Sequence, residues 1–219
     1  MDFNVFLRAI SVGAIPLICA ITLHEVAHGW AAKLCGDRTA EAQGRLSLNP
    51  LNHVDPIGTL LLPAVLLLLG SPFLFGWAKP VPINPRALRD PRWDMVKVAA
   101  AGPAANVAMA ILWVLSINVA RSGVLPPGAS LWLVEMARMG VMANIWLAAF
   151  NLLPILPLDG GRVVANSLPA GQLRTGMERL EPYGFAIVLG LSYIGVLQLP
   201  IMALSLVIKR LVFFVTGHG

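Results

Sequence analysis

Long apolar segments alternate with polar, proline-containing loops along the whole chain. The apolar segments cover residues 5–32, 57–75, 96–119, 139–158 and 183–215. A membrane-spanning helix needs about 20 predominantly apolar residues. The pattern therefore predicts an all-α polytopic membrane protein, a helical bundle of about 4–6 membrane passes that forms a single domain over residues 1–219.

Two of these segments are less regular than the others. The segment 57–75 is broken by two prolines and a glycine, so we expect it to re-enter the membrane or to kink rather than to cross as a straight helix. The region 183–215 predicts one pass up to about Leu197. The apolar stretch that follows is interrupted by Lys209 and Arg210, which leaves a further pass and a helix lying in the interface equally open.

The composition agrees with a surface that faces lipid. The chain is 57% hydrophobic and 12% charged, with a mean hydropathy of +0.75, whereas soluble domains carry roughly 25% charged residues. The net charge of +5 suits an anionic membrane surface, and no basic run with interleaved aromatics predicts nucleic-acid binding. Cys19 and Cys35 are interpreted as packing residues. No cleavable signal is expected, because no small-residue processing site precedes His24.

The Lys and Arg residues predict an orientation in the membrane. Three lie in residues 33–56, five in 76–97 and three in 159–182, against two in 120–138. If the segment 57–75 re-enters, the three richer loops share the cytoplasmic side and the N-terminus lies outside. If it crosses fully, this bias weakens. The expectation is a multi-pass protein of the plasma membrane whose site is accessible from the cytoplasm.

The candidate chemistry begins at His24-Glu25-Val26-Ala27-His28. Four residues are close to one helical turn, so both imidazoles project from one face. Two neutral imidazoles at this spacing suit a tetrahedral zinc ion, and the neighbouring Glu25 can reach a water on the metal. The alternative is a pair of interior histidines packed with a glutamate. Each ionisable group inside the membrane costs roughly 2.5–3.5 kcal/mol on insertion scales, which favours a metal that compensates them.

A catalytic zinc site needs a third protein ligand and one open position. His53 and Asp55 are possible ligands, but they lie in a polar loop where solvation explains them. Asp159 is the better candidate, because it ends the segment 139–158 beside prolines and glycines that predict unwound backbone. Such backbone is tolerated at membrane depth only when it is buried or lines a wet cavity. One Zn²⁺ with ionised Asp159 and Glu25 forms a neutral site.

These motifs together resemble the site-2 protease family of intramembrane zinc metalloproteases. His24-Glu25-Val26-Ala27-His28 matches the zinc motif of that family, and Leu158-Asp159-Gly160 matches the motif that supplies the third ligand. The extended signature includes Asn151, Pro154 and Pro157, and Gly102-Pro103-Ala104-Ala105-Asn106 resembles the Gly-Pro-x-x-Asn helix start. The stretch from Gly44-Arg45-Leu46 to Asp55-Pro56 resembles a compact branch without added soluble domains.

The resemblance implies a helical membrane fold with a buried metal that water reaches from the cytoplasm. It also implies that the chain cleaves transmembrane segments of other proteins, with Glu25 as the base and His24, His28 and Asp159 as zinc ligands. The predicted partners are a transmembrane protein substrate and the lipid bilayer, with no nucleic acid. Two alternatives remain: a catalytically silent scaffold that binds transmembrane helices, and a metal transporter.

Three accessory positions have two interpretations each. Asn106 and Asn151 could bind substrate or the developing oxyanion, or could form interhelical hydrogen bonds. The proline-rich segment that contains Gly76, Trp77 and Ala78 is predicted to be extended. It could pair with an unwound substrate by strand addition, or it could be a rigid connector.

Overall fold

The computed structural model describes residues 3–70 and 76–217, and every regular element in these two ranges is helical. The predicted all-α class is therefore confirmed. The α-helices are α1 (Phe3–Leu34), α2 (Thr39–Ala42), α3 (Leu62–Leu68), α4 (Pro91–Arg121), α5 (Pro127–Asn151), α6 (Asp159–Ser167), α7 (Gln172–Tyr193) and α8 (Gln198–Val215). Single 3₁₀ or π turns cover Pro50–His53, Pro56–Leu61 and Pro85–Ala87.

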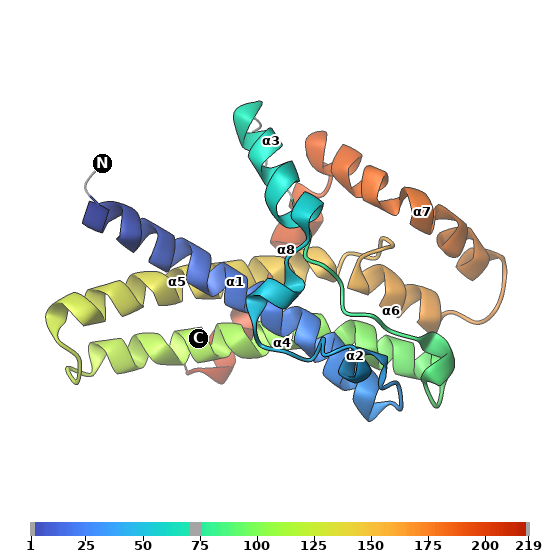
Figure 1. Cartoon of the computed structure of the whole chain (residues 1–219), viewed down its shortest axis with the longest axis horizontal. Helices are drawn as coiled ribbons and strands as arrows, with labels where there is room; N and C mark the ends of the chain where they lie inside the picture. Colours follow the sequence, from blue (N-terminus) through green and yellow to red (C-terminus); the bar gives the residue numbers. More distant parts are fainter. Residues whose placement is uncertain (1–2, 71–75, 218–219) are drawn as a thin grey trace.

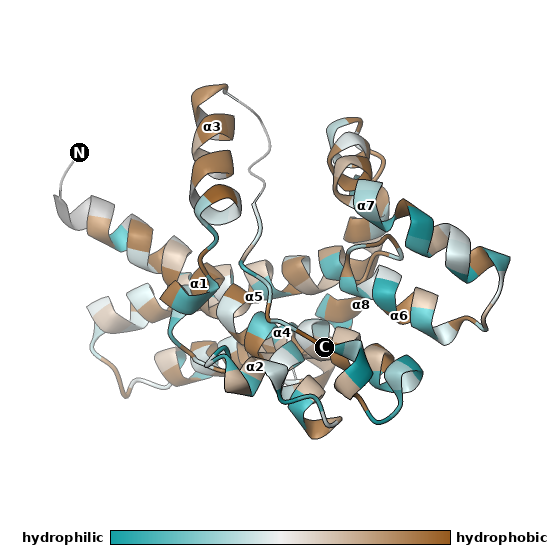
Figure 2. Cartoon of the chain, turned by 45° about the vertical axis from the view of Figure 1, so that its right-hand side comes forward, coloured by the Kyte–Doolittle hydropathy of each residue, from teal (hydrophilic) through white to brown (hydrophobic). Residues whose placement is uncertain are grey.

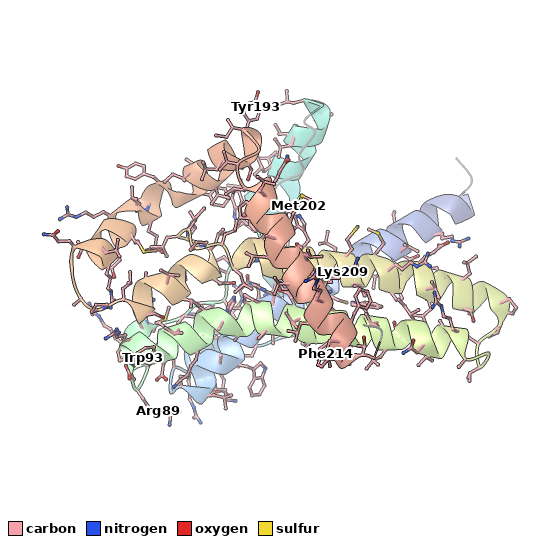
Figure 3. The ribbon with its side chains drawn as sticks, turned by 180° about the vertical axis from the view of Figure 1, so that it is seen from behind. Arg89, Trp93, Tyr193, Met202, Lys209 and Phe214 are labelled. Atoms are coloured by element: carbon pink, nitrogen blue, oxygen red, sulfur yellow. The ribbon has the colours of Figure 1, made fainter. Side chains whose placement is uncertain are left out.

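Helices α1, α4 and α5 pack together as one elongated layer, from which α3 and α7 rise (Figure 1). Helix α4 runs antiparallel to α1 and α5. Small residues allow this close packing, because Ala110, Ala148 and Ala149 are fully buried where the helices meet. Helix α8 crosses the back of α4 and α5 diagonally (Figure 3).

Four helices in the described ranges are long and apolar enough to cross a membrane. They cover Ile10–Leu34, Pro91–Arg121, Pro127–Asn151 and Gln198–Val215. Apolar residues predominate along these helices, whereas polar residues gather on α6, on α7 and in the loops beside them (Figure 2). The chain is therefore a multi-pass membrane protein. The sequence left open whether the stretch after Pro200 is a further pass or a helix lying in the interface. This stretch belongs to α8, which meets the criteria for a span.

Two predicted segment boundaries differ from the structure. The segment predicted at 139–158 begins twelve residues earlier, at Pro127, and its helix ends at Asn151. The sequence pattern excluded the first half of α5 because of its charges, but Arg8 of α1 donates to both carboxylate oxygens of Glu135, at 2.7 and 3.0 Å. The region 183–215 divides close to the predicted Leu197, since α7 ends at Tyr193 and α8 begins at Gln198, but of these two helices only α8 meets the criteria for a span.

The residues before and after α3 lie side by side, because Gly58 and Thr59 form hydrogen bonds with Trp77. The backbone amide of Trp77 donates to the carbonyl of Gly58 at 3.1 Å, and Thr59 Oγ1 donates to the carbonyl of Trp77 at 2.8 Å. Residues 71–75, the last part of the predicted segment 57–75, lie outside the described ranges. The chain therefore enters and leaves the segment around α3 beside Gly58, and re-entry of this segment into the membrane stays a prediction.

The basic loops gather at one end of the helical layer. The amide of Arg89 donates to the carbonyl of Cys35 at 3.1 Å, which joins the end of α1 to the start of α4. The guanidinium of Arg92 donates to the carbonyls of Asn166 and Ser167 at 3.0 and 2.8 Å and so satisfies the C-terminus of α6. Arg89 and Trp93 mark this end in Figure 3. Loops that the Lys and Arg counts assigned to one membrane face are thus neighbours in space.

Candidate metal centre

Three predicted ligands converge inside the helical layer. His24 Nε2 lies 3.1 Å from His28 Nε2 and 3.1 Å from Asp159 Oδ2, and His28 Nε2 lies 3.3 Å from Asp159 Oδ1. Both histidines are buried, with 6% and 7% of their surface exposed. His24 is ten residues from the end of α1, which places it roughly 15 Å along the helix at ~1.5 Å per residue.

The Nδ1 atoms of His24 and His28 fix the orientation of both imidazole rings. His28 Nδ1 donates to the carbonyl of Val98 at 2.7 Å, and His24 Nδ1 donates to Asn106 Oδ1 at 2.6 Å. A neutral imidazole that carries its proton on Nδ1 has a lone pair on Nε2. Both Nε2 atoms therefore present lone pairs towards each other and towards Asp159, which is the tautomer that a metal ligand requires.

The donor set fits a tetrahedral zinc ion. Ligand bonds of about 2.0–2.1 Å at tetrahedral angles give separations of about 3.3 Å between ligand atoms. The two Nε2 atoms lie 3.1 Å apart, and one oxygen of Asp159 lies 3.1 Å from His24 Nε2 while the other lies 3.3 Å from His28 Nε2. Asp159 Oδ2 is buried and has no hydrogen-bond partner among the described residues. Two lone pairs and a carboxylate in contact repel one another, and a cation between them compensates that repulsion.

A glycine of α4 makes room for the two imidazoles. A methyl group on Gly102 would overlap His28 Nε2 and lie 2.6 Å from His24 Cε1. Gly102 opens the Gly-Pro-x-x-Asn motif, so the physical reason for glycine at this position is the close approach of α4 to the ligands. Any larger residue would displace the rings.

Unwound backbone carries Asp159 into the site, as the sequence predicted. Helix α5 ends at Asn151, residues 152–158 are irregular, and Asp159 lies in the first turn of α6. A Cβ on Gly160 or Gly161 would overlap the backbone of Leu152 or Ile155. On the other side, a Cβ on Gly184 of α7 would overlap the carbonyl of Leu156. Three glycines thus let helices pack directly against the segment that positions Asp159.

Glu25 is oriented by residues 76–84, an irregular segment that precedes α4. Glu25 Oε2 accepts a hydrogen bond from the amide of Val81 at 3.0 Å. That segment is anchored in turn, because Arg45 donates to the carbonyls of Lys79 and Pro80 at 2.9 and 3.2 Å, and the amide of Lys79 donates to the carbonyl of His53. The carboxylate of Glu25 is thus anchored next to the two histidines. The sequence pattern did not reveal its contact with Val81.

The accessory residues have defined positions. Asn106 is fully buried and holds His24, and its amide also donates to Ala20 O and Asn144 Oδ1. Asn151 donates to the carbonyl of Leu147 one turn earlier in α5. The segment of Gly76, Trp77 and Ala78 has no regular secondary structure, and the Trp77 ring contacts Phe185 of α7 edge-on, with 4.7 Å between the ring centroids. These contacts match the interhelical and connector interpretations, and the substrate-binding roles stay predictions.

The other ligand candidates have structural partners elsewhere. His53 Nε2 donates to the carbonyl of Ser47 at 2.9 Å. Asp55 Oδ1 accepts from the amides of Ile57 and Gly58 at 3.0 and 2.7 Å, so Asp55 caps the turn that follows it. Among the described residues, the group of His, Cys, Asp and Glu side chains close enough to share an ion consists of His24, His28 and Asp159.

Comparison with known proteins identifies the family. Residues 12–131 and 128–194 match the profile of Peptidase family M50. The chain belongs to this family. This M50 peptidase is 40% identical over 177 residues to the Bacillus subtilis protein named "Putative zinc metalloprotease YwhC", a match that covers 80% of this chain and 77% of the relative.

Two mycobacterial proteins with the same description, both called Rip2, also match this M50 peptidase. The protein from Mycolicibacterium smegmatis is 31% identical over 172 residues, which cover 78% of this chain and 62% of the relative. The protein from Mycobacterium tuberculosis strain H37Rv is 32% identical over 145 residues, which cover 65% and 52%. The chain therefore spans less than two thirds of either mycobacterial relative. No solved structure matches it. The predicted recognition and the enzyme class, a zinc metalloprotease, are confirmed.

Proposed function

We propose that this chain is a zinc-dependent intramembrane endopeptidase that hydrolyses peptide bonds in transmembrane segments of other membrane proteins. The observation that carries the proposal is the position of His24 and His28 on α1, a helix long and apolar enough to span a membrane, with Asp159 of the short helix α6 brought against them. Family membership adds that the substrates are proteins. We infer from the grouped basic loops that this end of the layer faces the cytoplasm.

In this proposal His24, His28 and Asp159 hold the zinc ion. When bound, the ion supplies Lewis acidity that polarises the scissile carbonyl and makes water a stronger acid. Glu25 takes the proton from the attacking water and later delivers it to the leaving amine. The hydrogen bond from Val81 occupies Oε2, so Oε1 is the oxygen that exchanges protons in this scheme. Zinc, Asp159 and Glu25 keep the site neutral throughout.

A substrate helix has to be unwound before a protease can cleave it, and the extended segment offers a backbone edge for it. Both backbone groups of Trp77 are already used by Gly58 and Thr59. Neighbouring residues of an extended chain point their amides and carbonyls to opposite sides. We therefore assign substrate pairing to Ala78 rather than to Trp77, with Gly76 as the flexible residue before them.

The test compares wild type with Glu25→Gln in membranes. We expect new N-termini inside transmembrane segments of other membrane proteins in cells that express the wild type, with a loss of about 10²–10⁴-fold in Glu25→Gln, the range for removal of a general base. Both proteins should carry equal zinc. Identical sets of N-termini would refute the proteolytic role, and zinc uptake by proteoliposomes with unchanged uptake in Glu25→Gln would favour the transporter.

A further inference from the structure

The two histidines are oriented by groups of different chemistry. His28 Nδ1 faces the carbonyl of Val98, which can only accept a hydrogen bond. His24 Nδ1 faces the carboxamide of Asn106, which could present either its oxygen or its NH₂ group. The backbone alone therefore fixes the proton of His28 on Nδ1. For His24 something else must decide which end of the amide faces the ring.

A directed chain of hydrogen bonds makes that decision. Asn106 Nδ2 donates to the carbonyl of Ala20 at 3.1 Å and to Asn144 Oδ1 at 2.9 Å. Asn144 Nδ2 donates to the carbonyl of Gly140 at 2.8 Å. Because the chain ends on a backbone carbonyl, Asn144 must turn its NH₂ group towards Gly140 and its oxygen towards Asn106. The two acceptors together, the carbonyl of Ala20 and Oδ1 of Asn144, then require Asn106 to turn its oxygen towards His24.

Burial prevents the amides in this series of hydrogen bonds from reversing their direction. Asn106 and Asn144 are both 0% exposed, so water is not at hand to satisfy a reversed amide. A flip of Asn106 would place its oxygen against the oxygens of Ala20 and Asn144 and its NH₂ group against His24. A donor there would favour the His24 tautomer with the proton on Nε2, which cannot bind a metal.

We propose that Asn144 is a positioning residue of the metal site, which through Asn106 keeps the proton of His24 on Nδ1 and its Nε2 lone pair free for the ion. The inference rests on the metal site of the proposed function and adds a residue on α5, a helix that supplies none of the three ligands. A purely structural contact between α4 and α5 would hold with the amides in either direction. The direction itself is therefore the property to test.

Two substitutions separate direction from packing. Asn144→Leu keeps the number of side-chain heavy atoms but removes the acceptor for Asn106. Asn144→Asp keeps an oxygen towards Asn106 whether the carboxyl is ionised or neutral, so the chain beyond it keeps its direction. Loss of packing alone would affect the two variants alike or would harm Asn144→Asp more, because the introduced carboxyl group would be buried.

The experiment uses zinc-loaded protein in detergent with ¹⁵N-labelled histidine, of which the chain has four. We expect slow hydrogen exchange at Nδ1 of both His24 and His28 in the wild type and in Asn144→Asp. In Asn144→Leu, exchange at His24 should accelerate while exchange at His28 stays unchanged. Zinc affinity, measured by competition with a chelator, should fall about tenfold in Asn144→Leu, the lower end of the range for groups that orient metal ligands, and should be retained in Asn144→Asp.

Unchanged His24 exchange and zinc affinity in Asn144→Leu would overturn the inference, and so would equal losses in both variants. If Asn144→Leu does not fold, the wild type decides, because nuclear Overhauser contacts from the NH₂ group of Asn106 must go to Asn144 and not to the His24 ring. Contacts to the ring would overturn the inference while zinc binding leaves the proposed function standing. A wild type that binds no zinc would refute both.

Discussion

Replacing Gly102 by alanine should expel the metal without changing a ligand. The added methyl group would lie 2.6 Å from His24 Cε1, whereas ordinary contacts begin at 3.4 Å, and it would overlap His28 Nε2. The rings must therefore retreat by roughly 0.8 Å or more, several times the tolerance of about 0.2 Å for metal–ligand distances. Both rings are also held from behind by Asn106 and Val98, so they cannot retreat without losing those hydrogen bonds.

We expect Gly102→Ala to lower zinc affinity by at least 10–100-fold, the range found when ligand orientation alone is disturbed. Crowding a well-packed interior typically costs about 1–3 kcal/mol, so the variant should also unfold at lower temperature. The assay is zinc content and chelator competition on detergent-purified protein, with a thermal melt alongside. Activity follows zinc content in this variant.

Two glycines provide matched controls for this substitution. Gly29→Ala crowds Leu46 and Val81 from the same helix as the histidines but does not touch the ligands, so it should lose stability and keep zinc. Gly190→Ala on α7 meets open space and should be neutral or slightly stabilising. Full zinc affinity in Gly102→Ala, or a loss matched by Gly29→Ala, would refute the argument from contact with the rings.

Two further predictions concern the loops beside the site. Val81→Pro removes the amide that holds Glu25 and should lower turnover with zinc retained, whereas Val81→Ala should retain both; equal turnover in the two variants would refute the anchoring role. Burial raises the pKa of the Asp37 carboxyl, but hydrogen bonds from Thr39 and Asn84 outweigh burial and hold that pKa below its ordinary value. Asp37 therefore stabilises the fold above its unfolded-state pKa of about 3.9, and this contribution is lost as the pH falls through the lower folded-state pKa. Asp37→Asn should cost about 1.5–3 kcal/mol at neutral pH, and a cost that persists in acid melts would contradict this.

The grouping of His24, His28 and Asp159 could be predicted from the sequence because their spacing and surroundings are local. Four residues place His24 and His28 on one helical face, and the prolines and glycines around Asp159 indicate unwound backbone. The extent of α5 could not be predicted in the same way. Its charge at Glu135 is compensated by Arg8, which lies 127 residues away along the chain. Local hydropathy contains no information about such a partner.

The groups that orient His24, Glu25 and His28 could not be predicted from the sequence pattern either. Val98 and Val81 act through backbone atoms, so their side chains give no signal of the role. Asn144 lies outside every motif, and its hydrogen bond with Asn106 exists only because α4 and α5 bring the two side chains together. Asn106 itself was visible in the Gly-Pro-x-x-Asn pattern, but its contact with His24 depends on how α1 crosses α4.

The most direct test of the account is the metal content of the detergent-purified protein, wild type beside Asp159→Ala, with Asp55→Ala as the matched control. We predict about one zinc per chain in the wild type and in Asp55→Ala, in line with a single three-ligand site, and a sharp loss in Asp159→Ala. Zinc retained in Asp159→Ala, or a wild type that holds none after reloading, would contradict the assignment of His24, His28 and Asp159 as the metal centre.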